Sequence, residues 1–225
     1  GYLSYRSKVW QNTSRGGLPK SFLENMNFEK YVDMAINLPL LFVYKNGIHT
    51  RPDGKTFKEF MEGKLSGLKN EIPDIKDFEN HLATIFREVR LKQYIEIRSL
   101  DTCEWDCHCS GPAFYTGLLY GAIDEALEII NKWNASDVLN AYIEAPTKGF
   151  KTVLANKTLL EWGKIFLSLA KKGLVNRSIK NTKDKDETIF LQSIESILNN
   201  NSSKATNAIR KFKKQKNLEF LYEKI

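Results

Sequence analysis

The stretch LKQYIEIRSLD, residues 91–101, decides the fold class, because apolar and polar side chains alternate along it as they do along a β-strand. Ile95 and Ile97 are predicted to share one face of this strand. Glu96 and Arg98 are two residues apart, so they are predicted to lie side by side on the other face. The pattern is typical of an antiparallel sheet with one polar face.

Upstream of this stretch the sequence predicts both helices and strands. Apolar residues recur at helical spacing over about 28–38 and 74–86. Residues 40–45 are rich in β-formers, and Asn46-Gly47 is a strong signal for a hairpin turn into a second strand. A Gly-Gly pair and a proline within residues 13–19 predict a loop.

Downstream of residue 101 every signal is helical. Thr158 and Glu161 match a capping box, and Gly173 is predicted to end the helix that they open. The predicted helices span about 112–130, 135–143, 159–172, 187–199 and 203–215. The chain is therefore predicted to be α+β, with a sheet-containing half-domain over residues 1–110 and a helical C-terminal region over residues 111–225.

The composition is that of a globular protein. The 225 residues include 34 Lys and Arg against 27 Asp and Glu, and 42% are hydrophobic, which excludes a chain that is disordered throughout. The longest apolar run, residues 38–44, is much shorter than the ~20 residues that span a bilayer, and no membrane partner is expected. No signal peptide is recognisable and the first residue is Gly1, so we expect a fragment or processed chain from the cytoplasm.

Basic residues gather at the C-terminal end, where residues 203–225 hold seven Lys or Arg and two Glu. A basic helix can bind nucleic acid. More often such a helix only presents a solvated face, and no nucleic-acid motif with interleaved aromatic residues accompanies this one. The solvated face is the preferred interpretation, and nucleic acid is the alternative partner.

Three cysteines, Cys103, Cys107 and Cys109, fall within seven residues. Their odd number and the lack of a signal peptide favour a reducing compartment over a disulfide framework. The run could ligate zinc, but zinc sites normally have a second, separated ligand pair, and none is recognisable. We expect three thiols in or near a core, which would be sensitive to oxidation if they were exposed.

Two interpretations of Glu96 and Arg98 stay open on the residues alone. On the outer face of a sheet both side chains would simply be solvated. On a face that lines a ligand cavity, the carboxylate could hold Mg²⁺ and the guanidinium could bind a phosphate or carboxylate through two hydrogen bonds. No Walker A motif, dinucleotide glycine motif or Gly-Xaa-Ser-Xaa-Gly motif occurs in the sequence, so the common enzyme templates do not apply.

Several blocks of the sequence resemble the glutamate–cysteine ligases of the plant and alphaproteobacterial type. They occur in family order and cover most of residues 1–170, and they include GYLSYRSKVW (1–10), FEKYVD (28–33), DFENHLATIF (77–86), YIEIR (94–98) and PAF (112–114). Beyond about residue 175 the match is vague. The chain resembles the C-terminal half of such an enzyme.

The resemblance implies an ATP-dependent ligase that joins the γ-carboxylate of glutamate to the amine of cysteine through a γ-glutamyl phosphate, the first step of glutathione biosynthesis. It implies a fold similar to glutamine synthetase, in which an antiparallel sheet forms a cavity with helices outside. Glu96 would be a Mg²⁺ ligand, and Arg98 a catalytic residue that contacts transferred phosphate or substrate. Arg6, Trp10 and Tyr44 would belong to the amino-acid substrate pocket.

Two other hypotheses stay open beside the ligase. The chain could be a non-catalytic remnant or half-enzyme that needs a partner carrying the missing N-terminal half, or it could be a basic nucleic-acid-binding module. His81 lies in a block that matches the ligases, but we expect a histidine bonded into the core from its helix, with no part in catalysis.

Overall fold

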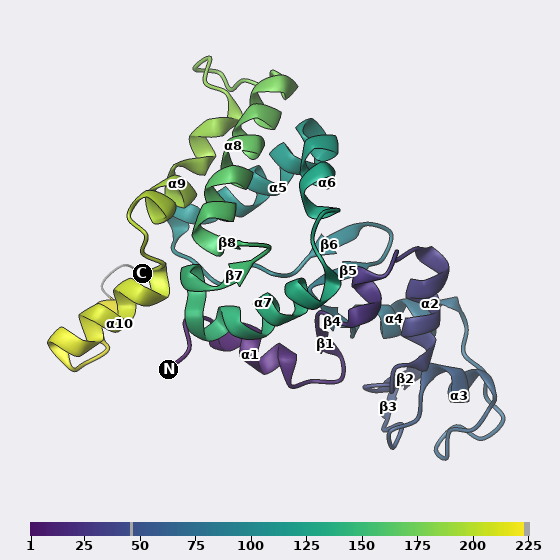
Figure 1. The fold of residues 1–225 in the computed structure, drawn as a ribbon. Helices are drawn as coiled ribbons and strands as arrows, with labels where there is room; N and C mark the ends of the chain where they lie inside the picture. The colour runs from purple at the N-terminus through teal and green to yellow at the C-terminus, as the bar shows by residue number, and fades with distance from the viewer. Residues whose placement is uncertain (46, 223–225) are drawn as a thin grey trace. The chain divides into compact units, whose positions relative to one another are not determined.

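The computed structural model describes residues 1–45 and 47–222 and is drawn as a ribbon in Figure 1. The chain forms two compact units: an N-terminal unit, Arg6–Ser99, and a C-terminal unit, Gly1–Tyr5 with Leu100–Ile225. Both contain helices and short paired strands, which confirms the α+β class. The boundary predicted near residue 110 stays a prediction. Among the described residues, none of the helices combines the length and the apolar character that crossing a bilayer requires.

The N-terminal unit is built from short helices and two-residue or three-residue strands. The helices are α1 (Tyr5–Gln11), the 3-10 helix η1 (Lys20–Leu23), α2 (Phe28–Asn37), α3 (Phe57–Met61) and α4 (Ile75–Ala83). The strands are β1 (Gly16–Gly17), β2 (Val43–Lys45), β3 (Ile48–Thr50), β4 (Phe86–Arg87), β5 (Val89–Leu91) and β6 (Ile95–Ile97). The predicted helix over 28–38 and the predicted hairpin after it are confirmed, while Asn46 of the turn lies outside the described residues.

Capping residues set where the helices of this unit begin. The side chain of Asn27 accepts a hydrogen bond from the backbone N–H of Lys30 at the start of α2. A capping box formed by Thr56 and Glu59 opens α3, and a second one, from Asp74, opens α4. The helices close over a core that includes Leu40, Val43, Phe57, Phe60 and Leu65.

The predicted loop at residues 13–19 contains a strand, which corrects the sequence interpretation. Gly16 and Gly17 form β1 and pair in parallel with β4. Because Phe86 and Arg87 are needed for this pairing, α4 ends at Ala83 and does not continue to residue 86 as predicted. A Cβ on Gly16 would lie 2.7 Å from the Trp10 ring, so the approach of this segment to α1 requires glycine.

The decisive stretch is a hairpin rather than one long strand. β5 and β6 pair antiparallel, with Arg90 opposite Glu96, and the chain turns at residues 92–94. The alternation continues through the turn in the sequence and so hides it. Gln93 lies exposed in this turn and not on a strand face.

The C-terminal unit is mainly helical. Its α-helices are α5 (Ser110–Gly121), α6 (Ile123–Ile130), α7 (Ala135–Lys148), α8 (Leu159–Arg177), α9 (Gln192–Asn199) and α10 (Lys204–Gln215). Its 3-10 helices are η2 (Trp105–Cys107), η3 (Gly149–Lys151), η4 (Glu187–Leu191) and η5 (Glu219–Leu221). The strands β7 (Val153–Leu154) and β8 (Lys157–Thr158) form a hairpin that the sequence interpretation missed.

Helices α5 and α8 form the centre of this unit, side by side in Figure 1. Their backbones touch through small residues: a Cβ on Gly117 would lie 2.2 Å from the carbonyl oxygen of Ala170, and one on Gly173 would lie 1.9 Å from the carbonyl oxygen of Gly117. Gly173 therefore serves close packing within α8. It does not end the helix, which continues to Arg177, and this corrects the predicted cap.

Candidate functional site

Glu96 on β6 is held between two arginines. The Nε and Nη2 atoms of Arg90, its cross-strand neighbour, both donate to Oε2 of Glu96, at 2.9 and 2.6 Å. Nη1 of Arg98 donates to the other carboxylate oxygen, Oε1, at 2.7 Å. The prediction that Glu96 and Arg98 lie side by side is therefore confirmed.

Glu96 and its two arginines are more sheltered than Ile95, which lies on the other face of β6. The side chains of Arg90, Arg98 and Glu96 are 11%, 19% and 27% exposed, whereas Ile95 is 67% exposed. The sequence left open the interpretation that Glu96 and Arg98 are simply solvated. In that case their side chains would be more exposed than Ile95. Partial burial of three charged groups is costly unless they are paired, and here they pair with one another.

Arg98 is also fixed by its backbone and by an aromatic ring. Its N–H donates to the carbonyl oxygen of Glu88 at 2.8 Å, which extends the hairpin ladder by one bond. Its guanidinium lies 5.4 Å from the centre of the Phe86 ring, a cation–π contact. Trp10 on α1 stacks on the same ring with centroids 5.1 Å apart.

Arg6 joins the cluster from α1. Its Nη2 atom donates to the carbonyl oxygen of Arg98. Two buried nitrogen atoms, Nη1 of Arg6 and Nε of Arg98, have no hydrogen-bond partner among the described residues. Buried donors normally have partners, so these two atoms lack an acceptor that the described residues do not supply. The structure thus brings together four of the predicted or implied site residues, Arg6, Trp10, Glu96 and Arg98.

The carboxyl group of Glu96 is held ionised. Partial burial acts to raise its pKa, but the hydrogen bonds and charges of Arg90 and Arg98 outweigh that effect, so the pKa lies below its ordinary value. A cluster of three arginines and one ionised carboxylate keeps an excess of positive charge, which suits an anionic ligand.

Arg90 was missed in the sequence interpretation. It falls in the same segment as the decisive stretch, but its place opposite Glu96 depends on the turn at residues 92–94. The signal for it is this turn, because a hairpin that turns there pairs Arg90 directly with Glu96.

Tyr44 lies apart from this cluster. It is on the β2–β3 hairpin, its ring lies 4.7 Å from that of His49, and it is 48% exposed. In Figure 1 this hairpin is separate from β5 and β6 within the same unit. The role of Tyr44 in a substrate pocket stays a prediction that no contact with Arg6 or Trp10 supports among the described residues.

His81 is bonded into the core, as predicted. Its Nε2 atom lies 2.8 Å from the carbonyl oxygen of Ala35, and its ring stacks on Phe57. A carbonyl can only accept, so Nε2 carries the proton. Burial, with a smaller contribution from the charge of Arg15, lowers the pKa of His81, although the bond to Ala35 acts in the other direction. His81 is therefore neutral and structural.

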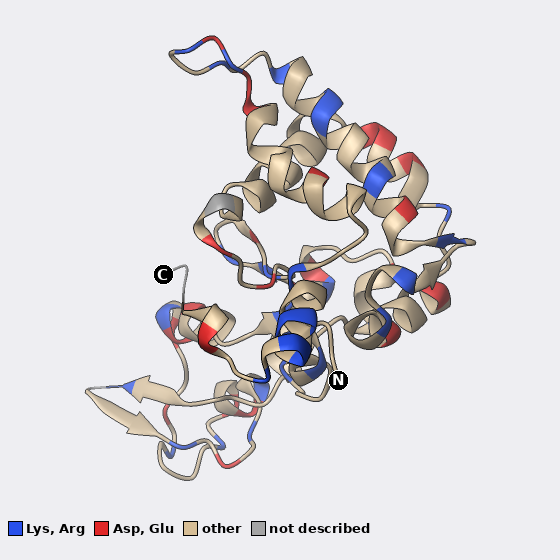
Figure 2. Cartoon of the chain, turned by 90° about the vertical axis from the view of Figure 1, so that its left-hand side faces the viewer, with Lys and Arg blue, Asp and Glu red and all other residues tan. Residues whose placement is uncertain are grey.

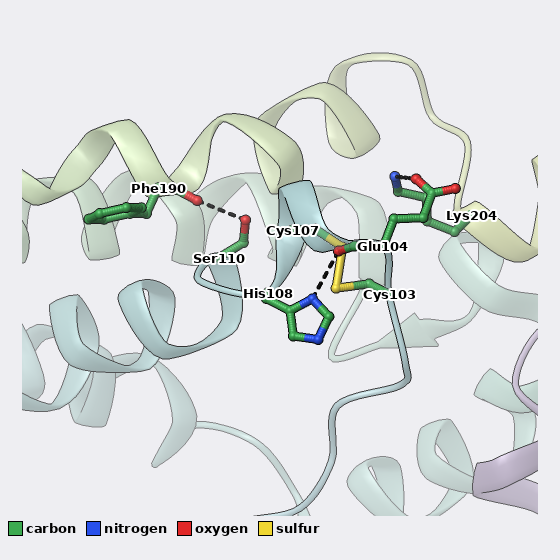
Figure 3. The surroundings of a disulfide bond; sticks show 7 residues. All are labelled: Cys103, Glu104, Cys107, His108, Ser110, Phe190 and Lys204. Atoms are coloured by element: carbon green, nitrogen blue, oxygen red, sulfur yellow. Dashed lines mark hydrogen bonds and ion pairs between the residues drawn. A yellow bond between two sulfur atoms is a disulfide. The ribbon is translucent and has the colours of Figure 1, made fainter. Parts of the chain in front are cut away.

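The cysteines differ from the prediction of three thiols. Cys103 and Cys107 form a disulfide around η2, shown in Figure 3, and Cys109 is an exposed free cysteine. Close spacing, which we interpreted as a group of core thiols, instead brings two sulfur atoms within bonding reach. Next to this disulfide, Glu104 forms an ion pair with Lys204 at 2.7 Å.

The described residues do not form a magnesium site on their own. Both oxygens of Glu96 already accept hydrogen bonds from arginines. Within the described part of the chain, no three His, Cys, Asp or Glu side chains are grouped so that they could hold a metal ion. The implied role of Glu96 as a Mg²⁺ ligand stays a prediction, and the donor set present here suits an anion better.

An arginine cluster beside two stacked rings has the donor chemistry that suits phosphate or carboxylate groups. Comparison with known families makes this specific. The sequence matches the family described as glutamate-cysteine ligase family 2 (GCS2) over residues 1–224, and the chain belongs to this family. The match confirms the resemblance and extends it past residue 175, where the sequence blocks were vague.

The relatives are plant enzymes. The chain is 37% identical to "Glutamate--cysteine ligase, chloroplastic" of Nicotiana tabacum over 203 residues, which is 88% of this chain and 38% of the tobacco protein. It is 36% identical to the protein of the same name from Brassica juncea over 217 residues, 94% of this chain and 41% of that protein. The chain thus spans about two fifths of the length of these relatives.

The expectation of a cytoplasmic protein is wrong. The related enzymes are named as chloroplastic, including those of Nicotiana tabacum, Solanum lycopersicum and Arabidopsis thaliana. The lack of a recognisable signal peptide gives no information on the compartment, because the chain covers only part of each relative.

Proposed function

We propose that the chain is part of an ATP-dependent ligase that joins the γ-carboxylate of glutamate to the amine of cysteine and forms γ-glutamylcysteine. The observation that carries the proposal is the family match over residues 1–224, together with the gathering of Arg6, Trp10, Glu96 and Arg98 in one cluster. ATP, glutamate and cysteine are the substrates, and the first product is a γ-glutamyl phosphate. The fold that we propose for the whole enzyme is similar to glutamine synthetase.

The arginines would stabilise the negative charge that develops during phosphoryl transfer. Phosphoryl transfer passes through a loose transition state whose negative charge is spread over oxygen atoms, so the protein contributes mainly positioning and positive charge. Arg98 and Arg6 each have one buried nitrogen without a partner among the described residues, and we propose that substrate oxygens supply the missing acceptors. We assign Arg98 to the transferred phosphate or the substrate carboxylate, and Arg6 and Trp10 to the amino-acid substrate.

Glu96 would act through the arginines. Its two oxygens fix the guanidinium groups of Arg90 and Arg98 in orientation, so its charge keeps the cluster together when no substrate is bound. This positioning role differs from that of a Mg²⁺ ligand in a measurable way. Loss of a metal ligand raises the Mg²⁺ requirement, whereas loss of a positioning group raises the KM for the anionic substrate.

The test uses a ligase of full length that carries this segment, assayed by ATP-dependent and cysteine-dependent phosphate release. Arg98→Lys keeps the charge but loses the planar fork, and we expect a loss of at least ~10-fold in kcat/KM. Glu96→Gln should lower kcat strongly and raise the KM for glutamate. Gln93→Ala, in the exposed turn of the same hairpin, is the control and should leave the rate unchanged.

Two outcomes would decide against these assignments. If Arg98→Lys matched the control, the arginine cluster would have no part in ligation. If Glu96→Gln changed the Mg²⁺ requirement and left the KM for glutamate unchanged, Glu96 would be a metal ligand and not a positioning residue.

A further inference from the structure

Helix α10 (Lys204–Gln215) has one apolar stripe along its length. Ala205, Ala208, Ile209 and Phe212 recur at helical spacing, so they lie on one face. A surface helix normally buries such a stripe against its own domain. Here none of the residues of α10 is buried, and Ile209 and Phe212 are 37% and 46% exposed.

The opposite side of α10 is basic. Lys204 forms an ion pair with Glu104, but Arg210, Lys211, Lys213 and Lys214 form none with any described acid. Figure 2 shows Lys and Arg in blue along this helix. The helix is therefore amphipathic. Its apolar stripe is partly exposed, and the cations that flank the stripe form no ion pairs with described acids, apart from Lys204.

The segment after α10 adds to this surface. Lys216 caps the helix in the left-handed conformation, and the chain then presents Leu218, Leu221 and Tyr222, all exposed. Phe220 turns the other way: it is buried, and Lys211 lies over its ring. Cations and exposed apolar side chains thus lie together from Lys204 to Tyr222.

We propose that α10 binds the surface of an anionic lipid bilayer, lying in the plane of the headgroups with its apolar stripe inserted. Helices that bind in this way have a basic face and an exposed apolar face. Their low net hydrophobicity keeps them from spanning the bilayer. The charge is complementary to anionic headgroups. This proposal replaces the expectation of no membrane partner, which rested on the lack of a spanning segment.

Nucleic acid is the less suitable partner for this surface. Phosphate contacts would use the basic face, but they would leave Ile209 and Phe212 in water. A bilayer interface engages both faces of the helix at once, because the apolar side chains enter the acyl boundary while the lysines stay among the headgroups.

The experiment is co-sedimentation of the full chain with vesicles of phosphatidylcholine, alone or with 30% phosphatidylglycerol (about a third anionic lipid, enough for a negative surface potential). We expect binding only to the anionic vesicles, and less of it as salt is raised. Lys213→Gln with Lys214→Gln should weaken the partition by about 30-fold. Phe212→Ser leaves the charge unchanged and should weaken it by about tenfold.

The matched control is Lys183→Gln with Lys185→Gln, which removes the same charge from an exposed loop of the same unit and should leave binding unchanged. Circular dichroism checks that each variant is folded. The proposal is overturned if the chain does not bind anionic vesicles, or if Phe212→Ser binds them as tightly as the wild type. Binding to duplex DNA without vesicle binding, or self-association that Phe212→Ser abolishes, would likewise assign the surface to another partner.

Discussion

Glu96 is held by one arginine at each of its carboxylate oxygens. The alternation of side chains placed it beside Arg98, and the 2.7 Å hydrogen bond between them confirms this. What the sequence could not show is Arg90, which takes the other carboxylate oxygen from across the hairpin. Because both oxygens accept hydrogen bonds, the carboxylate of Glu96 orients the guanidinium groups of Arg90 and Arg98.

His81 makes a prediction about pH at the residue scale. Its lowered pKa means that the unfolded chain takes up a proton at higher pH than the folded one. The stability that His81 contributes is thus present above the unfolded pKa, about 6.5, and is lost as the pH falls through the lower folded pKa. The slope for one proton is at most about 1.4 kcal/mol per pH unit.

The measurement compares urea unfolding between pH 5 and pH 7.5 (about the range over which a histidine titrates). His81→Gln keeps an amide N–H for the carbonyl of Ala35 and cannot titrate, so its free energy of unfolding should change less with pH than that of the wild type. His49→Gln, at an exposed position, is the control and should keep the wild-type slope. An unchanged slope in His81→Gln would show that another group carries the pH dependence.

At the scale of elements, local signals predicted the helix starts well and the helix ends poorly. The predicted capping box at Thr158 is confirmed, because the capping interaction lies within four consecutive residues. The predicted ends at Phe86 and Gly173 are wrong, because contacts distant in the sequence decide them. Phe86 pairs with Gly16, and Gly173 packs against α5.

Strands were harder to predict than helices for the same reason. The turn at residues 92–94 does not interrupt the alternation, so a hairpin looked like one strand. The β7–β8 hairpin is only two residues long on each side, and its turn places Ala155 and Asn156 at positive φ. An alanine in that conformation is uncommon, so the turn carries a weak sequence signal.

The packing of α5 on α8 gives a prediction at this scale. Gly173→Ala would place a Cβ 1.9 Å from the carbonyl oxygen of Gly117, and a backbone atom cannot move aside without shifting the helix. We expect a loss of about 1–3 kcal/mol or more in the free energy of unfolding, measured by urea titration with circular dichroism.

Gly163→Ala in the same helix is the control for this packing. Its Cβ would meet only the flexible end of the Leu198 side chain, at 2.8 Å. Alanine also favours a helix over glycine by up to about 1 kcal/mol, so we expect a change within about 1 kcal/mol of the wild type. Equal losses in the two variants would contradict the account of α5–α8 packing.

At the scale of the whole molecule, the sequence predicted the α+β class and the family, and both are confirmed. Strand signals before residue 101 and helix signals after it suffice for the class. The sheets themselves are two-stranded in the described residues, which leaves the cavity of a glutamine-synthetase-like fold as a proposal for the longer enzyme. The chain spans about two fifths of its relatives, so the rest of their length could supply further strands and acidic groups.

The last prediction concerns the activity of the chain on its own, since it covers only about two fifths of its relatives. Residues 1–225 alone should not make γ-glutamylcysteine, because they cover about two fifths of the relatives' length and both oxygens of Glu96 are already engaged by arginines. Joined to sequence that supplies the rest of a ligase, the same residues should take part in catalysis.

The most direct measurement is the amount of γ-glutamylcysteine formed from glutamate, cysteine and ATP, detected by mass spectrometry. It compares the 225-residue chain, a longer protein in which this chain is joined to sequence that supplies the rest of a ligase, and the same longer protein with Arg98→Lys. We predict product from the longer protein only, dependent on ATP, and at least ~10-fold less from the variant. No product from the longer protein, under conditions in which a plant relative is active, would contradict the central claim that this chain is part of a glutamate–cysteine ligase.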